Sequence, residues 1–189
     1  KSCRKKRRSL MPIYLIPFFF FIFFSNSYAE NKENIIKNLI DTRNFQFNFE
    51  QNINGKIENG NCIIEYPKKI FCEYTGSKNK ILVSNGRSLV IKTRTSYYRY
   101  PLKKTPLNLI LDKDFLINKI SNSEERIIDN NLINYKIFEN NNEINIFFDN
   151  KTFNLIGWQN TDIYQNLNIT FISSIRKNRK ISKNLFKLP

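Results

Sequence analysis

The apolar residues of this chain change their spacing near residue 44. In residues 31–43 they recur at helical intervals, which predicts an amphipathic helix. The apolar face of that helix consists of Ile35, Ile36, Leu39 and Ile40. Immediately afterwards, Phe45, Phe47 and Phe49 alternate with polar residues, which is the period of a strand with one buried face. The pattern therefore predicts a helix followed by a sheet.

Short strands joined by turns account for most of the remaining chain. Asn54–Gly55 and Asn59–Gly60 are typical of turns. Asn85–Gly86 predicts a tight hairpin, because both residues tolerate the positive φ that a primed turn requires. The runs predicted as further strands are 62–66, 70–74, 81–84, 88–92, 127–139, 143–149, 152–158 and 163–173. Links this short force neighbouring strands to be antiparallel, so we expect a meander and not a doubly wound α/β fold.

A second helix is predicted within the meander. Thr105 is the expected N-cap, and Pro106 would occupy the first helical position. The apolar residues that share one face of this helix are Leu107, Ile110, Leu111 and Phe115. A single amphipathic helix inside a meander must lie across one side of the sheet, and the helix at 31–43 could cover the same side. Together they would enclose an apolar cavity whose shape suits an acyl chain.

The amino-terminal 29 residues have the pattern of a secretion signal. A basic head precedes the uncharged apolar run 11–24, and small residues lead to a predicted cut between Ala29 and Glu30. The apolar run is shorter than the roughly 20 residues of a membrane-spanning helix. We therefore expect a cleavable signal at residues 1–29 and one domain at 30–189, with an uncleaved amino-terminal anchor as the alternative.

Charge and cysteine content narrow the class of protein. The chain of 189 residues has a net charge of +15, and removal of the six basic residues of the signal leaves +9. The remaining basic residues are scattered apart from a cluster at 176–187, which we expect to attract anionic phospholipid at most, and we expect no nucleic-acid partner. Cys62 and Cys72 flank a short turn in an exported domain, so they form either a cross-strand disulfide or a pair of small buried thiols.

Catalytic and metal-binding patterns are missing from the sequence. The chain contains no His, the usual general base near neutral pH, and two Cys are too few for a zinc site. Glu124–Glu125 has the polar surroundings of a solvated turn, and no glycine-rich phosphate loop occurs. We assign no catalytic residue, no metal site and no cofactor, and we expect a protein that is not an enzyme.

Motifs along the chain resemble a known family. Phe45-x-Phe47-x-Phe49-x-Gln51 follows a helix, and Leu82–Leu89, Thr105-Pro106-Leu107 and the ending Phe186–Pro189 come after it in that order. Together they resemble the outer-membrane lipoprotein carrier protein family (LolA-like) over nearly all of residues 30–189. The resemblance implies an α+β fold, an open antiparallel β half-barrel of about 10–11 strands with helices covering the concave apolar face.

The same resemblance implies a function. Such a protein is a soluble periplasmic carrier that binds the acyl chains of lipoproteins. It receives them from an inner-membrane lipoprotein-releasing transporter and delivers them to an outer-membrane acceptor, without a cofactor and as a monomer. Receptors of this fold are themselves lipoproteins with a Cys at the cut, and Glu30 at that place favours the soluble carrier. A general lipid- or glycolipid-binding protein and a regulatory interaction module are the alternatives.

The residues expected at the acyl-chain site and its lid come from the two apolar patterns. They are Phe45, Phe47, Phe49, Ile64, Leu82, Leu89, Ile91, Leu107, Ile110 and Leu111, each with core packing as its other interpretation, and Trp158 is expected in the core. Many members of the family have an Arg before the proline that corresponds to Pro67, where it holds the lid shut. Here Tyr66 offers a single hydroxyl in place of that forked set of donors.

Overall fold

A computed structural model describes residues 27–189 of the protein, except 77–78, 130, 140–141 and 162–165. The helices in this part of the chain are α1 (Ser27–Asp41), the 3-10 helix η1 (Leu102–Lys104), α2 (Leu107–Leu111) and α3 (Lys113–Ser121). The strands are β1 (Asn44–Ile53), β2 (Lys56–Glu65), β3 (Lys69–Thr75), β4 (Ile81–Asn85), β5 (Ser88–Lys92), β6 (Tyr97–Pro101), β7 (Glu125–Ile128), β8 (Leu132–Glu139), β9 (Asn142–Asp149), β10 (Leu155–Thr161) and β11 (Leu167–Lys177). None of the described helices combines the length and the apolar character needed to cross a membrane.

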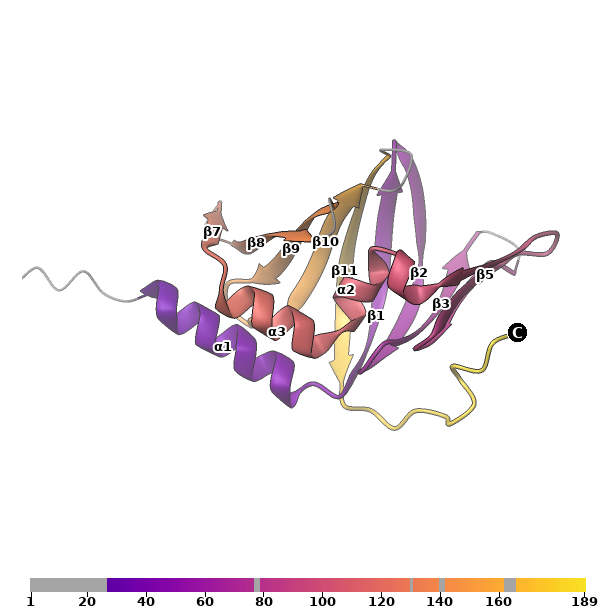
Figure 1. Cartoon of the computed structure of the whole chain (residues 1–189), viewed down its shortest axis with the longest axis horizontal. Helices are drawn as coiled ribbons and strands as arrows, with labels where there is room; N and C mark the ends of the chain where they lie inside the picture. Colours follow the sequence, from indigo (N-terminus) through magenta and orange to yellow (C-terminus); the bar gives the residue numbers. More distant parts are fainter. Residues whose placement is uncertain (1–26, 77–78, 130, 140–141, 162–165) are drawn as a thin grey trace, which may run out of the picture.

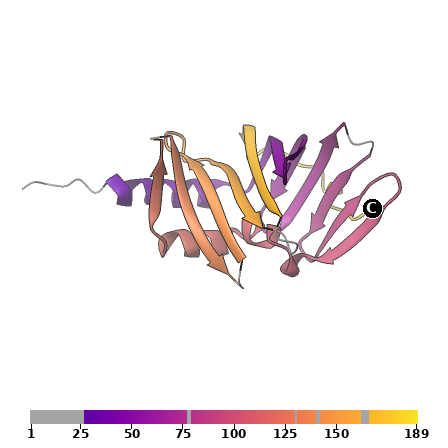
Figure 2. The same cartoon turned by 90° about the horizontal axis from the view of Figure 1, so that it is seen from above.

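All eleven strands form one antiparallel sheet in the order β6-β5-β4-β3-β2-β1-β11-β10-β9-β8-β7. The first and last strands pair at the centre, and the edges β6 and β7 are consecutive along the chain. The segment between the two edges carries η1, α2 and α3, so it crosses one side of the curved sheet, as Figures 1 and 2 show. The α+β fold predicted from the sequence, an open antiparallel half-barrel with helices over its apolar face, is confirmed.

The side chains that face the helices follow from the strand register. Phe45, Phe47 and Phe49 of β1 are all buried, while the residues between them reach solvent or are half-buried. Each lies opposite an inward residue of β2, such as Cys62 across from Phe47. These residues form a single core with the inward faces of α1 and α3, where Ile35 and Leu116 are 0% exposed. The alternation that predicted β1 thus also determines which face of the sheet meets the helices.

The predicted first helix is present but starts and ends earlier. Instead of covering 31–43, α1 ends at Asp41, and the chain turns at Thr42 into β1. The hydroxyl of Thr42 donates to the carbonyl of Asn38, 2.7 Å away, which uses one of the free carbonyls of the last turn. The predicted cut after Ala29 falls in the first turn of α1, and residues 1–26 of the expected signal lie outside the described residues.

The segment predicted as one helix consists of two. Asp112 has an extended backbone (ψ 95°) between α2 and α3, and its carboxylate accepts the N–H of Phe115 as the N-cap of α3. Pro106 and not Thr105 is the N-cap of α2, and the Thr105 hydroxyl does not cap the helix but donates to the carbonyl of Leu102 at 2.8 Å. The break gives α2 a direction of its own, and in Figure 1 α2 lies over β1 and β2 near the middle of the sheet.

Two of the predicted turns differ from expectation. Asn59–Gly60 is not a turn, because Gly60 lies inside β2 where its missing side chain leaves room for the ring of Phe49. In the β4–β5 hairpin only Gly86 has positive φ (94°), and it is the first of two loop residues, as in a type II′ turn. Asn85 instead accepts the N–H groups of Arg87 and Ser88 through its side chain.

Three strand predictions need correction as well. The run 127–139 divides into β7 and β8 around a turn, β10 extends to Thr161 where a turn was expected, and β6 was not predicted. Strand β6 consists largely of exposed residues, so it carries no alternation that could reveal it.

Candidate functional site

A cavity of about 290 Å³ lies between α2 and the inward face of the sheet. Strands β1 to β5 provide one part of its wall, β9 to β11 provide another, and α2 with the residues before it closes the side away from the sheet. The residues that line it are Phe47, Phe49, Gln51, Ile53, Glu58, Cys62, Ile70, Cys72, Tyr74, Lys80, Leu82, Leu89, Ile91, Thr105, Pro106, Leu107, Ile110, Ile144, Trp158, Asn160, Asn168 and Thr170. Most of this lining is apolar, which suits a hydrocarbon ligand.

Most of the residues expected at the site surround this cavity. They are Phe47, Phe49, Leu82, Leu89, Ile91, Leu107 and Ile110. The others lie outside the cavity wall and in the core: Ile64 and Leu111 are 0% exposed, and Phe45 stacks on Phe47 with ring centroids 5.2 Å apart. Trp158, expected in the core, belongs to the core cluster and also reaches the cavity. Strand parity puts the strand residues of this set on one side of the sheet but does not say which of them meet empty space.

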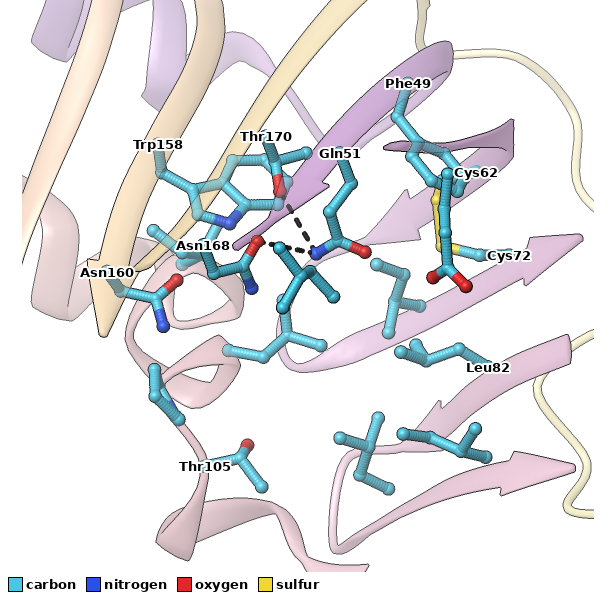
Figure 3. Close-up of a pocket in the computed structure, with 18 of the residues that line it drawn as sticks. Phe49, Gln51, Cys62, Cys72, Leu82, Thr105, Trp158, Asn160, Asn168 and Thr170 are labelled. Atoms are coloured by element: carbon cyan, nitrogen blue, oxygen red, sulfur yellow. Dashed lines mark hydrogen bonds between the residues drawn. A yellow bond between two sulfur atoms is a disulfide. The ribbon is translucent and has the colours of Figure 1, made fainter. Parts of the chain in front are cut away.

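Aromatic rings and a disulfide shape the floor of the cavity. Phe49 packs edge-on against Tyr74 across β2, with centroids 5.0 Å apart, and Gly60 lies between their strands. Cys62 and Cys72 are directly opposed on β2 and β3 and are joined in a disulfide, with Cα atoms 4.1 Å apart. The disulfide fixes two strands of the cavity wall to each other in Figure 3.

The junction between α2 and α3 is held by lysines and not by Tyr66. The Tyr66 hydroxyl is buried, has no hydrogen-bond partner among the described residues, and has its pKa raised by burial. Two residues further along, the Lys68 N–H donates to the carbonyl of Leu111 at 2.8 Å, and its ammonium lies 2.9 Å from the Asp112 carboxylate. Lys113 donates to the carbonyls of Ile40 and Thr42. The junction of α2 and α3 is therefore tied both to the β2–β3 turn and to the end of α1.

A group of polar residues at the cavity was not found by sequence reasoning. Gln51 donates through Nε2 to Asn168 Oδ1 at 2.9 Å and to Thr170 Oγ1 at 3.3 Å, and Asn160 lines the cavity nearby (Figure 3). One signal was available, because the alternation that turns Phe49 inward also turns Gln51 inward. The residues of β10 and β11 gave no such signal, since the expected positions of those strands were displaced by several residues.

A nearly buried ion pair completes this polar group. Glu58 lies opposite Gln51 and is 9% exposed, and Lys80 lies 2.5 Å from its carboxylate and 4.0 Å from the centre of the Tyr74 ring. Burial is the largest influence on the pKa of Glu58 and raises it. The hydrogen bonds and charges of Lys80 and Lys56 together outweigh burial, so the pKa lies below its usual value of 4.5.

We expect Glu58→Gln to lower the free energy of unfolding by roughly 1–3 kcal/mol at pH 7, because it leaves Lys80 without its partner. A carboxyl whose pKa is lowered by folding stabilises the protein above its unfolded pKa and ceases to do so as the pH falls through its folded pKa. The difference between wild type and variant should therefore be largest at pH 7 and smaller at an acid pH below the folded pKa of Glu58, which itself lies below 4.5. Urea unfolding at both pH values measures it, with Glu50→Gln on the exposed face of β1 as the control. A difference that does not change with pH would contradict this assignment.

The described part of the chain has no group of three or more His, Cys, Asp or Glu residues placed to bind a metal ion. The lining residues instead provide an apolar volume with hydrogen-bonding groups on one side. Such a site can bind an elongated apolar molecule that ends in a polar group.

Comparison with known proteins gives a family and a set of similar folds. The sequence matches the family described as "Outer membrane lipoprotein carrier protein LolA" over residues 41–189. A LolA superfamily protein from Nitrosomonas europaea is 8% identical to the chain with a TM-score of 0.47, over 87% of this chain and 99% of that one. LprF from Mycobacterium bovis is 12% identical with a TM-score of 0.48, over 85% and 98%. The Pseudomonas aeruginosa MucA/MucB complex matches at 8% identity with a TM-score of 0.48, over 87% and 62%. A search of curated protein sequences finds no match.

Proposed function

Because the chain belongs to the LolA family of outer membrane lipoprotein carrier proteins, we propose that it binds lipoproteins by their acyl chains and carries them from the inner to the outer membrane. The apolar cavity under α2 supports this proposal more than any other feature, since its lining suits hydrocarbon and its helix could act as a lid. Binding and release need no catalytic group, so the proposed carrier acts without enzymatic chemistry or a cofactor.

The size of the cavity requires that the lid move. A volume of about 290 Å³ lies at the lower end of the range for small-ligand sites, so a long acyl chain enters only when α2 moves away from the sheet. Sheltering a chain from water is worth roughly 0.8 kcal/mol per methylene, and a long chain held without opposition would never leave. The contacts of Lys68 with Leu111 and Asp112 resist opening and offset part of that gain, which keeps binding reversible.

Transport between membranes also requires export and two partners. We place the mature protein in the periplasm, after cleavage of residues 1–29, as a monomer. Its partners are an inner-membrane transporter that releases lipoproteins and an outer-membrane acceptor. The net charge of +9 expected for the mature chain favours approach to anionic membrane surfaces on both sides.

A release assay tests the carrier role. Spheroplasts that contain the transporter are incubated with the purified protein, and the supernatant is separated by size exclusion and probed for lipoprotein. We expect lipoprotein to elute in a soluble complex with the protein and to remain on the spheroplasts when the protein is omitted. The denatured protein at equal concentration controls for non-specific extraction.

The outcome separates the carrier from its alternatives. Recovery of free phospholipid or glycolipid without lipoprotein would favour a general lipid-binding protein. Absence of any lipid from the complex would contradict the cavity's role and favour a regulatory module that binds a protein partner.

A further inference from the structure

One side of the cavity is polar, although the rest of its lining is apolar. We define the polar wall as Gln51, Glu58, Asn160, Asn168 and Thr170, all of which line the cavity. Glu58, Asn160 and Thr170 are buried, at 9%, 7% and 3% exposed, whereas Gln51 and Asn168 are half-buried. Figure 3 shows Asn160, Asn168 and Thr170 on one side and Leu82 with the disulfide on the other. A buried polar group is costly unless it is hydrogen-bonded.

The register of four strands makes the polar wall continuous. Glu58, Gln51 and Thr170 lie opposite one another on β2, β1 and β11, and Trp158 of β10 follows. Asn168 and Asn160 face each other in the adjacent row on β11 and β10. The polar wall is therefore a single patch where the end of β1 meets the start of β11, and its position does not depend on any one side-chain conformation.

Several donor and acceptor atoms of the polar wall have no hydrogen-bond partner among the described residues. Gln51 uses its amide N–H groups on Asn168 and Thr170, and Asn160 uses one of its own on the carbonyl of Thr161 at 3.2 Å. Among the described residues, nothing donates to Gln51 Oε1 or Asn160 Oδ1, and nothing accepts from Asn168 Nδ2. Two acceptors and one amide donor group thus face the same cavity.

The charge of the polar wall limits what it can recognise. Glu58 and Lys80 are the only charged residues among the described lining residues, and they neutralise each other at 2.5 Å. A phosphate or a free carboxylate would find no unpaired cation there. A neutral group with a carbonyl oxygen matches the free amide donor. If the group also has an N–H, that N–H matches one of the free acceptors.

We propose that the polar wall binds the ester and amide linkages through which acyl chains are attached to a lipoprotein, while the chains occupy the apolar part of the cavity. Asn168 Nδ2 donates to the linkage carbonyl, and Gln51 Oε1 accepts the N–H when the linkage is an amide. This inference rests on the proposed function and adds to it that the protein recognises the polar linkage between the acyl chain and the lipoprotein. A plain hydrocarbon fills the same cavity without these bonds.

The test compares three probes that share one chain. They are pyrene-labelled dodecane and the methyl ester and N-methylamide of pyrene-labelled dodecanoic acid, titrated by fluorescence into the full-length protein. We expect Asn168→Leu to weaken the ester and the amide about fivefold to tenfold and to leave the hydrocarbon as tight or tighter. Gln51→Leu should weaken the amide more than the ester, because it removes both the acceptor for the amide N–H and the bond that positions Asn168. Leu82→Ala, in the apolar part, should weaken all three probes alike.

The two proposals fail in different ways. Equal effects of Asn168→Leu on all three probes, or no effect on any, would overturn the role of the polar wall while leaving acyl binding intact. Failure of the wild-type protein to bind any probe would overturn the proposed function and this inference with it. Asn168→Leu and Gln51→Leu are checked by thermal unfolding, and if Asn168→Leu does not fold, the greater loss of amide than of ester binding in Gln51→Leu decides.

Discussion

Leu82→Trp is expected to weaken acyl-chain binding at least tenfold without loss of stability. Leu82 lies in β4 opposite Cys72 and Ile91, is half-buried, and projects into the cavity of about 290 Å³. An indole placed there occupies the volume that the ligand needs and excludes the acyl chain sterically. Because the ring fills empty apolar space, the free energy of unfolding should stay within about 1 kcal/mol of wild type. Fluorescence titration with the pyrene-labelled ester measures binding, and urea unfolding measures stability.

The neighbouring position provides the matched control. Ile81 precedes Leu82 in β4 and points to the opposite face of the sheet, so Ile81→Trp introduces the same ring away from the cavity. We expect this variant to bind the probe like wild type. Undiminished binding by Leu82→Trp would show that acyl chains bind elsewhere on the protein.

Gly60→Ala is expected to cost about 2–4 kcal/mol of stability, a large part of the total for a domain of this size. A Cβ atom at this position would lie 2.1 Å from the backbone carbonyl oxygen of Glu73 and 2.7 Å from the ring of Phe49. Relief of the first clash requires β2 and β3 to separate, and relief of the second requires Phe49 to leave its contact with Tyr74. Both strands and both rings belong to the cavity floor, so probe binding should fall as well.

A second glycine separates this steric effect from the general preference of glycine for unusual backbone conformations. Gly55 has φ of 87° at the β1–β2 turn, and a Cβ there would meet nothing within 4 Å. Gly55→Asn, which tolerates that φ, should cost about 1 kcal/mol or less. Equilibrium unfolding in urea compares the two variants, and a loss in Gly60→Ala no greater than that in Gly55→Asn would contradict the steric explanation.

The sequence could locate the inward face of the sheet but not the cavity within it. Alternation in β1 correctly oriented Phe45, Phe47 and Phe49, yet Phe45 packs in the core and the other two line empty space. The difference arises from α2, which leaves a gap over Phe47 and Phe49. A period of two reports the side of the sheet and carries no information on how closely a distant helix approaches it.

The polar wall illustrates a second limit. Gln51 and Thr170 are 119 residues apart in sequence and meet only because β1 pairs with β11. The alternation in β1 turns Gln51 inward but does not say what it meets, and Thr170 taken singly looks like an ordinary solvated strand position. The two residues line the same cavity only because the pairing of β1 with β11 brings both strands under the same helix.

What the sequence determined by itself was local. The change from helical to alternating spacing fixed α1 and the first strands, short links fixed their antiparallel order, and the motifs around Thr105–Leu107 indicated the family. The tertiary structure decided the break at Asp112, the attachment of the α2–α3 junction through Lys68, and the division of the cavity into apolar and polar parts. The physical reason is that spacing along a chain records which side of an element is apolar. Contacts across the fold depend on how those sides pack together, and that is settled only when the whole sheet has formed.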